Sequence, residues 1–193
     1  MPVAKARDDN DQSHDRRSRI LEGARAAFLR FGFQRASMAD IAAGAGVSRT
    51  ALYHYFPGKE EVLVAVVDEL HARSLSEATK VLEASKTLDA ALIGVIDAKF
   101  GRTLAAITES PHGVELEDAT HRLTGEATRA AHNAFHRIVV KALGRYGRSK
   151  DADAVADTLI AAAKGLMRSG GDKHVTKSKF DARLRRLVAW VSD

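Results

Sequence analysis

Four side chains that can bind the edges and phosphates of a nucleic acid lie close together in the sequence: Arg49, Thr50, Tyr53 and His54. At this spacing a helix places all four on one face, because positions three or four apart are neighbours on a helix. An arginine can make two parallel hydrogen bonds to a guanine edge, and a threonine can contact a thymine methyl group. The set therefore indicates contact with the major groove of DNA.

Three further polar residues stand at the starts of predicted helices: Ser37, Ser48 and Lys59. The first turn of a helix presents backbone N–H groups without intrahelical partners, together with the positive end of the helix dipole, and both favour a phosphate. We expect all three to belong to the DNA-binding site: Ser37 and Lys59 contact phosphates, and Ser48 caps the helix that follows it. Such contacts set the position of a protein on DNA rather than its choice of sequence.

The segment 37–56 has the residue pattern needed to hold these side chains in place. Ser37 stands three residues before Asp40, the spacing of a capping box at a helix start. Gly46 occupies a turn that requires a positive φ, and Ala42 is small where a second helix crosses. The apolar wedge between the two helices is formed by Ile41, Val47 and Leu52. Together these features predict a helix-turn-helix.

The charge distribution points to the same segment. The formal net charge is +5, but residues 16–59 alone carry eight basic and two acidic side chains, for +6. A positive excess confined to one short stretch favours binding to a polyanion. Charge alone leaves open that the arginines only solvate the outer face of a helical unit, so the helix-turn-helix pattern decides between the two interpretations.

The sequence resembles the TetR family of transcriptional regulators. The residues that carry the resemblance are Arg19-Ile20-Leu21, Ala27-Phe28, Gly32-Phe33, Ser37 to Ala42, Ala45 to Ser48, Leu52 to Phe56 and Gly58-Lys59-Glu60. The resemblance implies that Tyr53 and Lys59 contact phosphates. It also implies a homodimer that responds to a small-molecule effector.

Periodic apolar residues predict an all-α protein of about nine helices, with no strand-like alternation. We expect a disordered leader over 1–15, a DNA-binding domain over 16–60 with its helix-turn-helix at 37–56, and an effector-binding and dimerisation domain over 61–193. The chain has no cysteine, no apolar signal-peptide core and no apolar run of the roughly 18 residues that span a bilayer. A cytoplasmic protein is expected.

Large apolar residues at helical spacing, with two histidines, are candidates for the lining of an effector pocket: Leu92, Ile96, Phe100, Leu104, His132, Phe135 and His136. The apolar members fit a plain hydrophobic core equally well. His132 and His136 share a helix face as metal ligands would, but no third ligand is assured. No metal and no cofactor are therefore predicted.

A dimer interface is expected on the two C-terminal helices, over 151–169 and 179–191. The first is rich in small residues that allow close helix approach, and the second has an apolar face of Leu184, Leu187, Val188 and Val191. Against a second copy they would form a four-helix bundle. The alternative is that these residues belong to the core of a single chain.

These observations predict a sequence-specific transcriptional regulator, a repressor that a small-molecule effector releases from a palindromic operator. Two alternatives remain: a ligand-dependent activator, and an architectural protein that binds DNA with little sequence preference. The sequence has none of the phosphate-loop, H-E-x-x-H, G-x-G-x-x-G or G-x-S-x-G motifs, and no enzyme is predicted.

Overall fold

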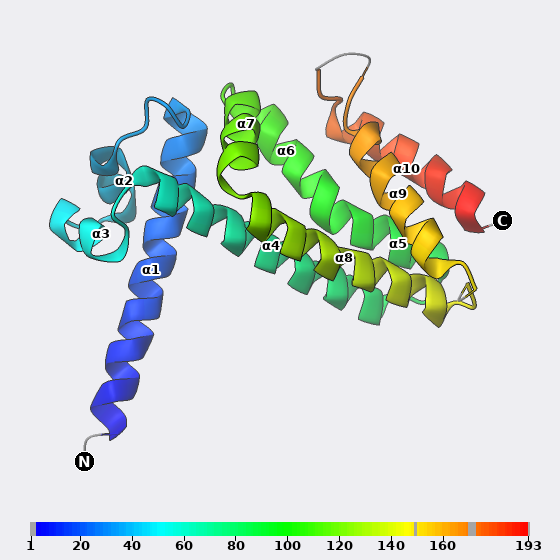
Figure 1. The fold of residues 1–193 in the computed structure, drawn as a ribbon, viewed down its shortest axis with the longest axis horizontal. Helices are drawn as coiled ribbons and strands as arrows, with labels where there is room; N and C mark the ends of the chain where they lie inside the picture. Colours follow the sequence, from blue (N-terminus) through cyan, green and yellow to red (C-terminus); the bar gives the residue numbers. More distant parts are fainter. Residues whose placement is uncertain (1–2, 149, 170–172, 193) are drawn as a thin grey trace. The chain divides into compact units, whose positions relative to one another are not determined.

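The computed structural model describes residues 3–148, 150–169 and 173–192 (Figure 1). Within these ranges the regular elements are helices, and extended pairing is limited to one isolated bridge between Arg168 and His174. Because α5 (Leu88–Ile96), η1 (Asp97–Gly101) and α6 (Arg102–Glu109) follow one another without a break, the described chain forms nine continuous helices. The predicted all-α class is confirmed.

The chain divides into two compact units. The first contains Met1–Glu69 together with Ser110–Thr124, and the second contains Leu70–Glu109 together with Gly125–Asp193. This division differs from the domain boundary expected at residue 60. The sequence motif ends near that residue, whereas compactness also depends on contacts made by segments that are distant in the sequence.

The first unit begins with α1 (Val3–Phe31), which extends back into the leader for which we expected disorder. Residues 1 and 2 of that leader lie outside the described residues. Positions 3–22 contain no glycine or proline to interrupt a helix. Arg19 also pairs with Asp15 one turn earlier, at 3.3 Å between Nε and Oδ2, in the order that favours a helix.

Three more helices complete the core of the first unit: α2 (Met38–Ala45), α3 (Arg49–Tyr55) and α7 (Gly113–Leu123), with the start of α4 (Lys59–Ala84). Together with α1, their inner faces supply the buried side chains Ile20, Phe28, Ile41, Leu52, Val62 and Ala119. A fully buried Leu, Ile or Phe contributes about 1.5–3 kcal/mol to the burial free energy. The helix-turn-helix is thus held by one hydrophobic cluster.

The second unit contains the rest of α4, then α5, η1 and α6, followed by α8 (Gly125–Arg145), α9 (Ala152–Leu166) and α10 (Lys177–Ser192). Leu92, Ile96, Phe135, Leu159 and Leu184 lie at the centre of its hydrophobic core. Among the helices described, none combines the length and the apolar character needed to cross a membrane.

Candidate nucleic-acid interface

The structure places the four predicted DNA-reading residues on the exposed face of α3. Arg49, Thr50 and His54 are exposed, and the side chain of Tyr53 has a relative exposure of 47% although it is aromatic. The opposite face of the helix carries Leu52, which is fully buried in the core of the unit. This short helix therefore presents donors and acceptors to solvent while its apolar side anchors it.

The turn before α3 has the local chemistry that the sequence predicted. Gly46 has a φ of 64°, in the left-handed region where a side chain would cause strain, and its N–H donates to the carbonyls that end α2. The Ser48 hydroxyl then accepts the N–H of Ala51 at 3.1 Å and caps α3. Ser48 thus fixes the start of α3, and its hydroxyl oxygen is bonded to the backbone of the same helix.

Ser37 begins α2 with a complete capping box. Its hydroxyl accepts the N–H of Asp40 at 3.2 Å, while its own N–H donates to the Asp40 carboxylate at 2.9 Å and its hydroxyl donates to the same oxygen at 2.5 Å. These hydrogen bonds from Ser37 lower the pKa of the Asp40 carboxyl group. The hydroxyl proton is therefore used within the box, and the N–H groups of the first turn of α2 are the donors that face outward.

Lys59 lies at the start of α4, but its ammonium group points into the protein. Nζ donates to the backbone carbonyls of Phe33 at 2.9 Å, Gln34 at 2.9 Å and Ala36 at 3.2 Å, and it lies 5.0 Å from the centre of the Phe33 ring. An ammonium group has three hydrogens, so these bonds use all of its donors. This placement differs from the phosphate contact that we expected of the Lys59 side chain.

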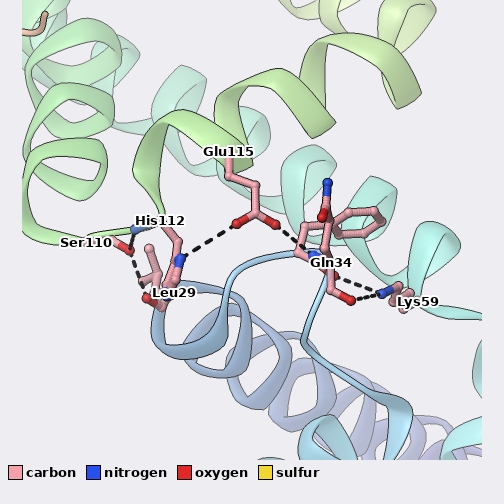
Figure 2. Close-up of polar contacts among 7 residues, drawn as sticks. Leu29, Gln34, Lys59, Ser110, His112 and Glu115 are labelled. Carbon is pink, nitrogen blue, oxygen red and sulfur yellow. Dashed lines mark hydrogen bonds and ion pairs between the residues drawn. The ribbon is translucent and has the colours of Figure 1, made fainter.

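The turn between α1 and α2 is also held by the start of α7, a contact that sequence reasoning missed (Figure 2). The Ser110 hydroxyl donates to the carbonyl of Leu29 at 2.8 Å, and the N–H of Gln34 donates to Glu115 Oε1 at 2.7 Å. The other carboxylate oxygen of Glu115 lies 3.6 Å from His112 Nδ1. Local patterns give no signal for a contact between segments so far apart in the sequence.

Gly32 shows how closely Glu115 approaches this turn. The residue has a φ of 78°, and a Cβ atom at its position would overlap the Glu115 carboxylate. The backbone conformation therefore favours glycine, and a side chain at this position would also displace the Glu115 carboxylate. Glu115 and Lys59 hold the turn between α1 and α2 with opposite charges, the first through an N–H and the second through carbonyls.

The predicted effector residues divide into two groups in the second unit. Leu92, Ile96, Phe100, Leu104 and Phe135 all lie in one buried hydrophobic cluster. His132, by contrast, is exposed, and the half-buried His136 places Nε2 3.1 Å from the exposed carboxylate of Asp157. The histidines are thus not enclosed with the apolar residues, and the lining of a cavity stays a prediction. Among the side chains described, no group of three or more His, Asp or Glu is placed to hold a metal ion.

On the C-terminal helices the predicted dimer face needs a correction. Leu184 and Val188 are fully buried in the core of a single chain, so the alternative interpretation holds for these two residues. Leu187 and Val191 are partly buried, whereas Trp190 has a relative exposure of 77%. Successive residues of a helix are rotated by about 100°, so neighbouring apolar residues can face either the core of the chain or its outer surface. The sequence pattern did not separate these two sets of residues.

Comparison with known proteins found a family model that matches part of the first unit. Residues 20–66 match the family model described as "Bacterial regulatory proteins, tetR family". The chain is 41% identical over 61 residues to the HTH-type transcriptional regulator TtgR of Pseudomonas putida, covering 32% of this chain and 29% of that protein. It is 37% identical over 73 residues to the HTH-type transcriptional repressor AcnR of Corynebacterium diphtheriae, covering 38% of this chain and 36% of the relative.

The matched regions thus span well under half the length of these two curated relatives. The fold extends further: the crystal structure of a TetR/AcrR-family transcriptional regulator from Thermobifida fusca superposes with a TM-score of 0.65, at 21% identity, over 90% of this chain and 96% of that one. At this identity the likeness concerns the fold alone. The N-terminal region of the chain, residues 20–66, thus matches the tetR family of bacterial regulatory proteins, and the fold of the chain is similar to that of a TetR/AcrR-family regulator.

Proposed function

We propose that this protein is a sequence-specific DNA-binding transcriptional repressor that a small-molecule effector releases from a palindromic operator. The observation that carries the proposal is the exposed face of α3, with Arg49, Thr50, Tyr53 and His54 turned to solvent beside a fully buried Leu52. An α-helix of this kind fits the major groove, which is about 12 Å wide. The description of AcnR as a repressor supports repression as the direction of control.

Base reading and positioning are assigned to different residues. Arg49 reads a guanine edge with its two parallel donors, and Thr50 contacts a thymine methyl group or a phosphate. Tyr53 donates its hydroxyl to a phosphate, and so do the first-turn N–H groups of α2 beside Ser37. The ammonium group of Lys59 is bonded to carbonyls of the same unit. Lys59 therefore holds the start of α4 in place and does not contact a phosphate through its side chain.

A palindromic operator requires two copies of α3 about 34–36 Å apart, one turn of B-DNA. We propose that α9 and α10 form the dimer. The outward face of α9 carries small residues at helical spacing, which allow close approach of a second helix, namely Ala154, Thr158, Ala161 and Gly165. The exposed Trp190 of α10 supplies the large apolar side chain that the centre of an interface needs.

An effector acts through its preference for one of two conformations. One of these conformations does not hold the two copies of α3 one turn of DNA apart. If the effector binds more tightly to that conformation, it weakens DNA binding by the free energy that couples the two sites, typically about 1–3 kcal/mol. Binding of the effector then releases the operator.

The test is selection of bound duplexes from a random library by the full-length protein, followed by titration of the selected and a scrambled duplex. We expect an inverted repeat bound about 10³-fold or more above the scrambled duplex. Arg49→Ala should lose about 1–3 kcal/mol and relax the preference at one base pair in each half-site. The matched control is Lys80→Ala, an exposed cation on α4, which should leave both values unchanged.

Equal affinity for the inverted repeat and the scrambled duplex would instead favour the architectural alternative. A protein that stays monomeric at the concentrations used would contradict the two-fold arrangement. Either result would reject the proposed function.

A further inference from the structure

Lys99 lies in the π-helical turn η1, which interrupts the regular helix that runs from α5 into α6. Single π-turns are rare and occur often at functional sites. The Lys99 side chain is half-buried, and its Nζ lies 4.8 Å from the centre of the Phe135 ring on α8. The Phe100 ring packs edge-on against the same ring, with 5.9 Å between centres. An ammonium group is thus placed against the aromatic part of the core.

No negative charge compensates this ammonium group. Among the residues that the structure describes, no carboxylate forms an ion pair with Lys99, and no hydrogen bond reaches its Nζ. Burial lowers the pKa of the Lys99 amine to about 8, so the group still carries its proton at pH 7. The face of the Phe135 ring compensates part of this charge, and a bound anion would compensate more of it.

His132 lies one helical turn before Phe135 on α8, next to the ring that Lys99 contacts, and the charges around it are more positive than negative. Burial, and then the nearby charge of Lys99, lower the pKa of His132 on α8. Lys164 on α9 adds a second positive charge to this neighbourhood. The negative charge nearby is that of Asp157, whose carboxylate lies 3.1 Å from His136 Nε2. The cluster therefore attracts anions, and the exposed His132 leaves it open to solvent.

We propose that Lys99 and His132 form the binding site for the carboxylate group of the effector, which is an organic monoanion. One carboxylate oxygen accepts a hydrogen bond from Lys99 Nζ and the other accepts one from the His132 imidazole. Lys99 is half-buried whereas Lys164 is exposed, so the site itself holds one ammonium group, which matches the one negative charge of a carboxylate better than the two of a phosphate. The identification of the anion as the effector rests on the proposed function, whereas binding of the anion does not.

The experiment uses the full-length protein without DNA and a panel of acetate, hexanoate, benzoate and salicylate, each beside its primary amide. Binding is followed by calorimetry and by the NMR signal of the His132 imidazole. We expect at least one carboxylate to bind at millimolar concentration or below, at least tenfold more tightly than its amide, and to shift the His132 signal. Lys99→Met should weaken that binding at least tenfold, Lys99→Arg should retain part of it, and the exposed control Lys80→Met should retain all of it.

Three results would overturn the site: no carboxylate binds better than its amide, Lys99→Met binds it as wild type does, or inorganic phosphate binds more tightly than every carboxylate. The role as effector is tested separately, by adding the bound carboxylate to the protein on its selected duplex. DNA affinity should fall at least fivefold for wild type and stay constant for Lys99→Met. A carboxylate that binds at Lys99 without changing DNA affinity rejects the effector role. A wild-type protein without preference for inverted repeats rejects the proposed function, and the anion site stands on the binding data.

Discussion

Glu115 and Gln34 are 81 positions apart in the sequence, yet Glu115 Oε1 accepts the backbone N–H of Gln34 at 2.7 Å. Gln34 lies in the turn that leads from α1 into the helix-turn-helix, and Glu115 lies in the first turn of α7. The carboxylate therefore holds a backbone group of the first compact unit from a distant segment of the sequence. The turn that leads into α2 is thus held in part by this side chain.

Replacing Glu115 should loosen the turn without unfolding the protein. For Glu115→Ala we expect the free energy of unfolding to fall by about 1 kcal/mol, because one hydrogen bond to a partly exposed carboxylate is lost. DNA affinity should fall several-fold. Urea denaturation and fluorescence anisotropy measure the two effects. Glu115→Gln retains an acceptor and should lose less, and Asp118→Ala, an exposed acid on the same helix, is the control. Equal losses for Asp118→Ala would refute a specific role.

Lys59→Met separates a structural role from a phosphate contact. The variant leaves the carbonyls of Phe33, Gln34 and Ala36 without their charged donor, so the free energy of unfolding should fall by about 1–3 kcal/mol. The slope of log K against log salt concentration for DNA binding should stay the same, because the ammonium faces the protein. A slope reduced by about one unit would show that Lys59 neutralises a phosphate after all.

Trp190 gives a direct measurement of the proposed dimer. The sequence contains one tryptophan, so fluorescence excited at a wavelength that tyrosine does not absorb reports this position alone. Dimer formation should move the emission to shorter wavelength as the protein is concentrated, because the exposed indole becomes buried. Trp190→Ser should raise the dimer dissociation constant at least tenfold in sedimentation equilibrium, about 1.4 kcal/mol. An emission spectrum that is independent of concentration, in a protein that sediments as a dimer, would place the interface elsewhere.

Lys99→Met should stabilise the protein at neutral pH. The folded-state pKa of about 8 lies below the ordinary value of 10.5, so between these values the unfolded chain binds more protons and stability rises with pH. Below pH 8 both states are protonated and the full cost of the buried charge is present. Discounted for partial exposure, the variant should gain about 1–3 kcal/mol at pH 7.

The gain from Lys99→Met should shrink as the pH rises from 8 to 10.5 and disappear above this range, where wild type has lost the proton in both states. Urea denaturation at several pH values, without added carboxylates, measures it. The titratable groups that act on His132 besides Lys99 are His136, Asp157 and Lys164, and the variant leaves them in place. Lys80→Met is the exposed control. A loss of stability at pH 7 would show that Lys99 is compensated in the folded protein.

The helix-turn-helix could be predicted because its determinants are local. The capping box of Ser37 and Asp40 lies within four residues, and the left-handed Gly46 lies within the turn that it makes. The exposed face of α3 follows from the spacing of Leu52 and Phe56 alone. Where the information lies within one or two helical turns, the pattern of residue types is sufficient.

The remaining features depend on contacts that sequence spacing does not encode. Lys59 stands at a helix start, where a phosphate contact was a reasonable expectation, but carbonyls 23 to 26 residues earlier take its ammonium group. The apolar pattern of α10 gave the face of Leu184 and Val188 correctly but did not distinguish a partner subunit from the chain's own core. Lys99 lies in a π-turn and its amine contacts the ring of Phe135, which is 36 positions later, and residue spacing indicates neither feature.

The return of the chain to its first compact unit at Ser110–Thr124 constrains protein engineering. A chimeric regulator made by fusing residues 1–69 to a foreign sensor would lack the hydroxyl of Ser110 and the carboxylate of Glu115, and it would expose Ala119's neighbours in the core. A chimera that keeps the first compact unit intact must include both of its segments. A graft with two junctions is therefore safer than a single cut within α4.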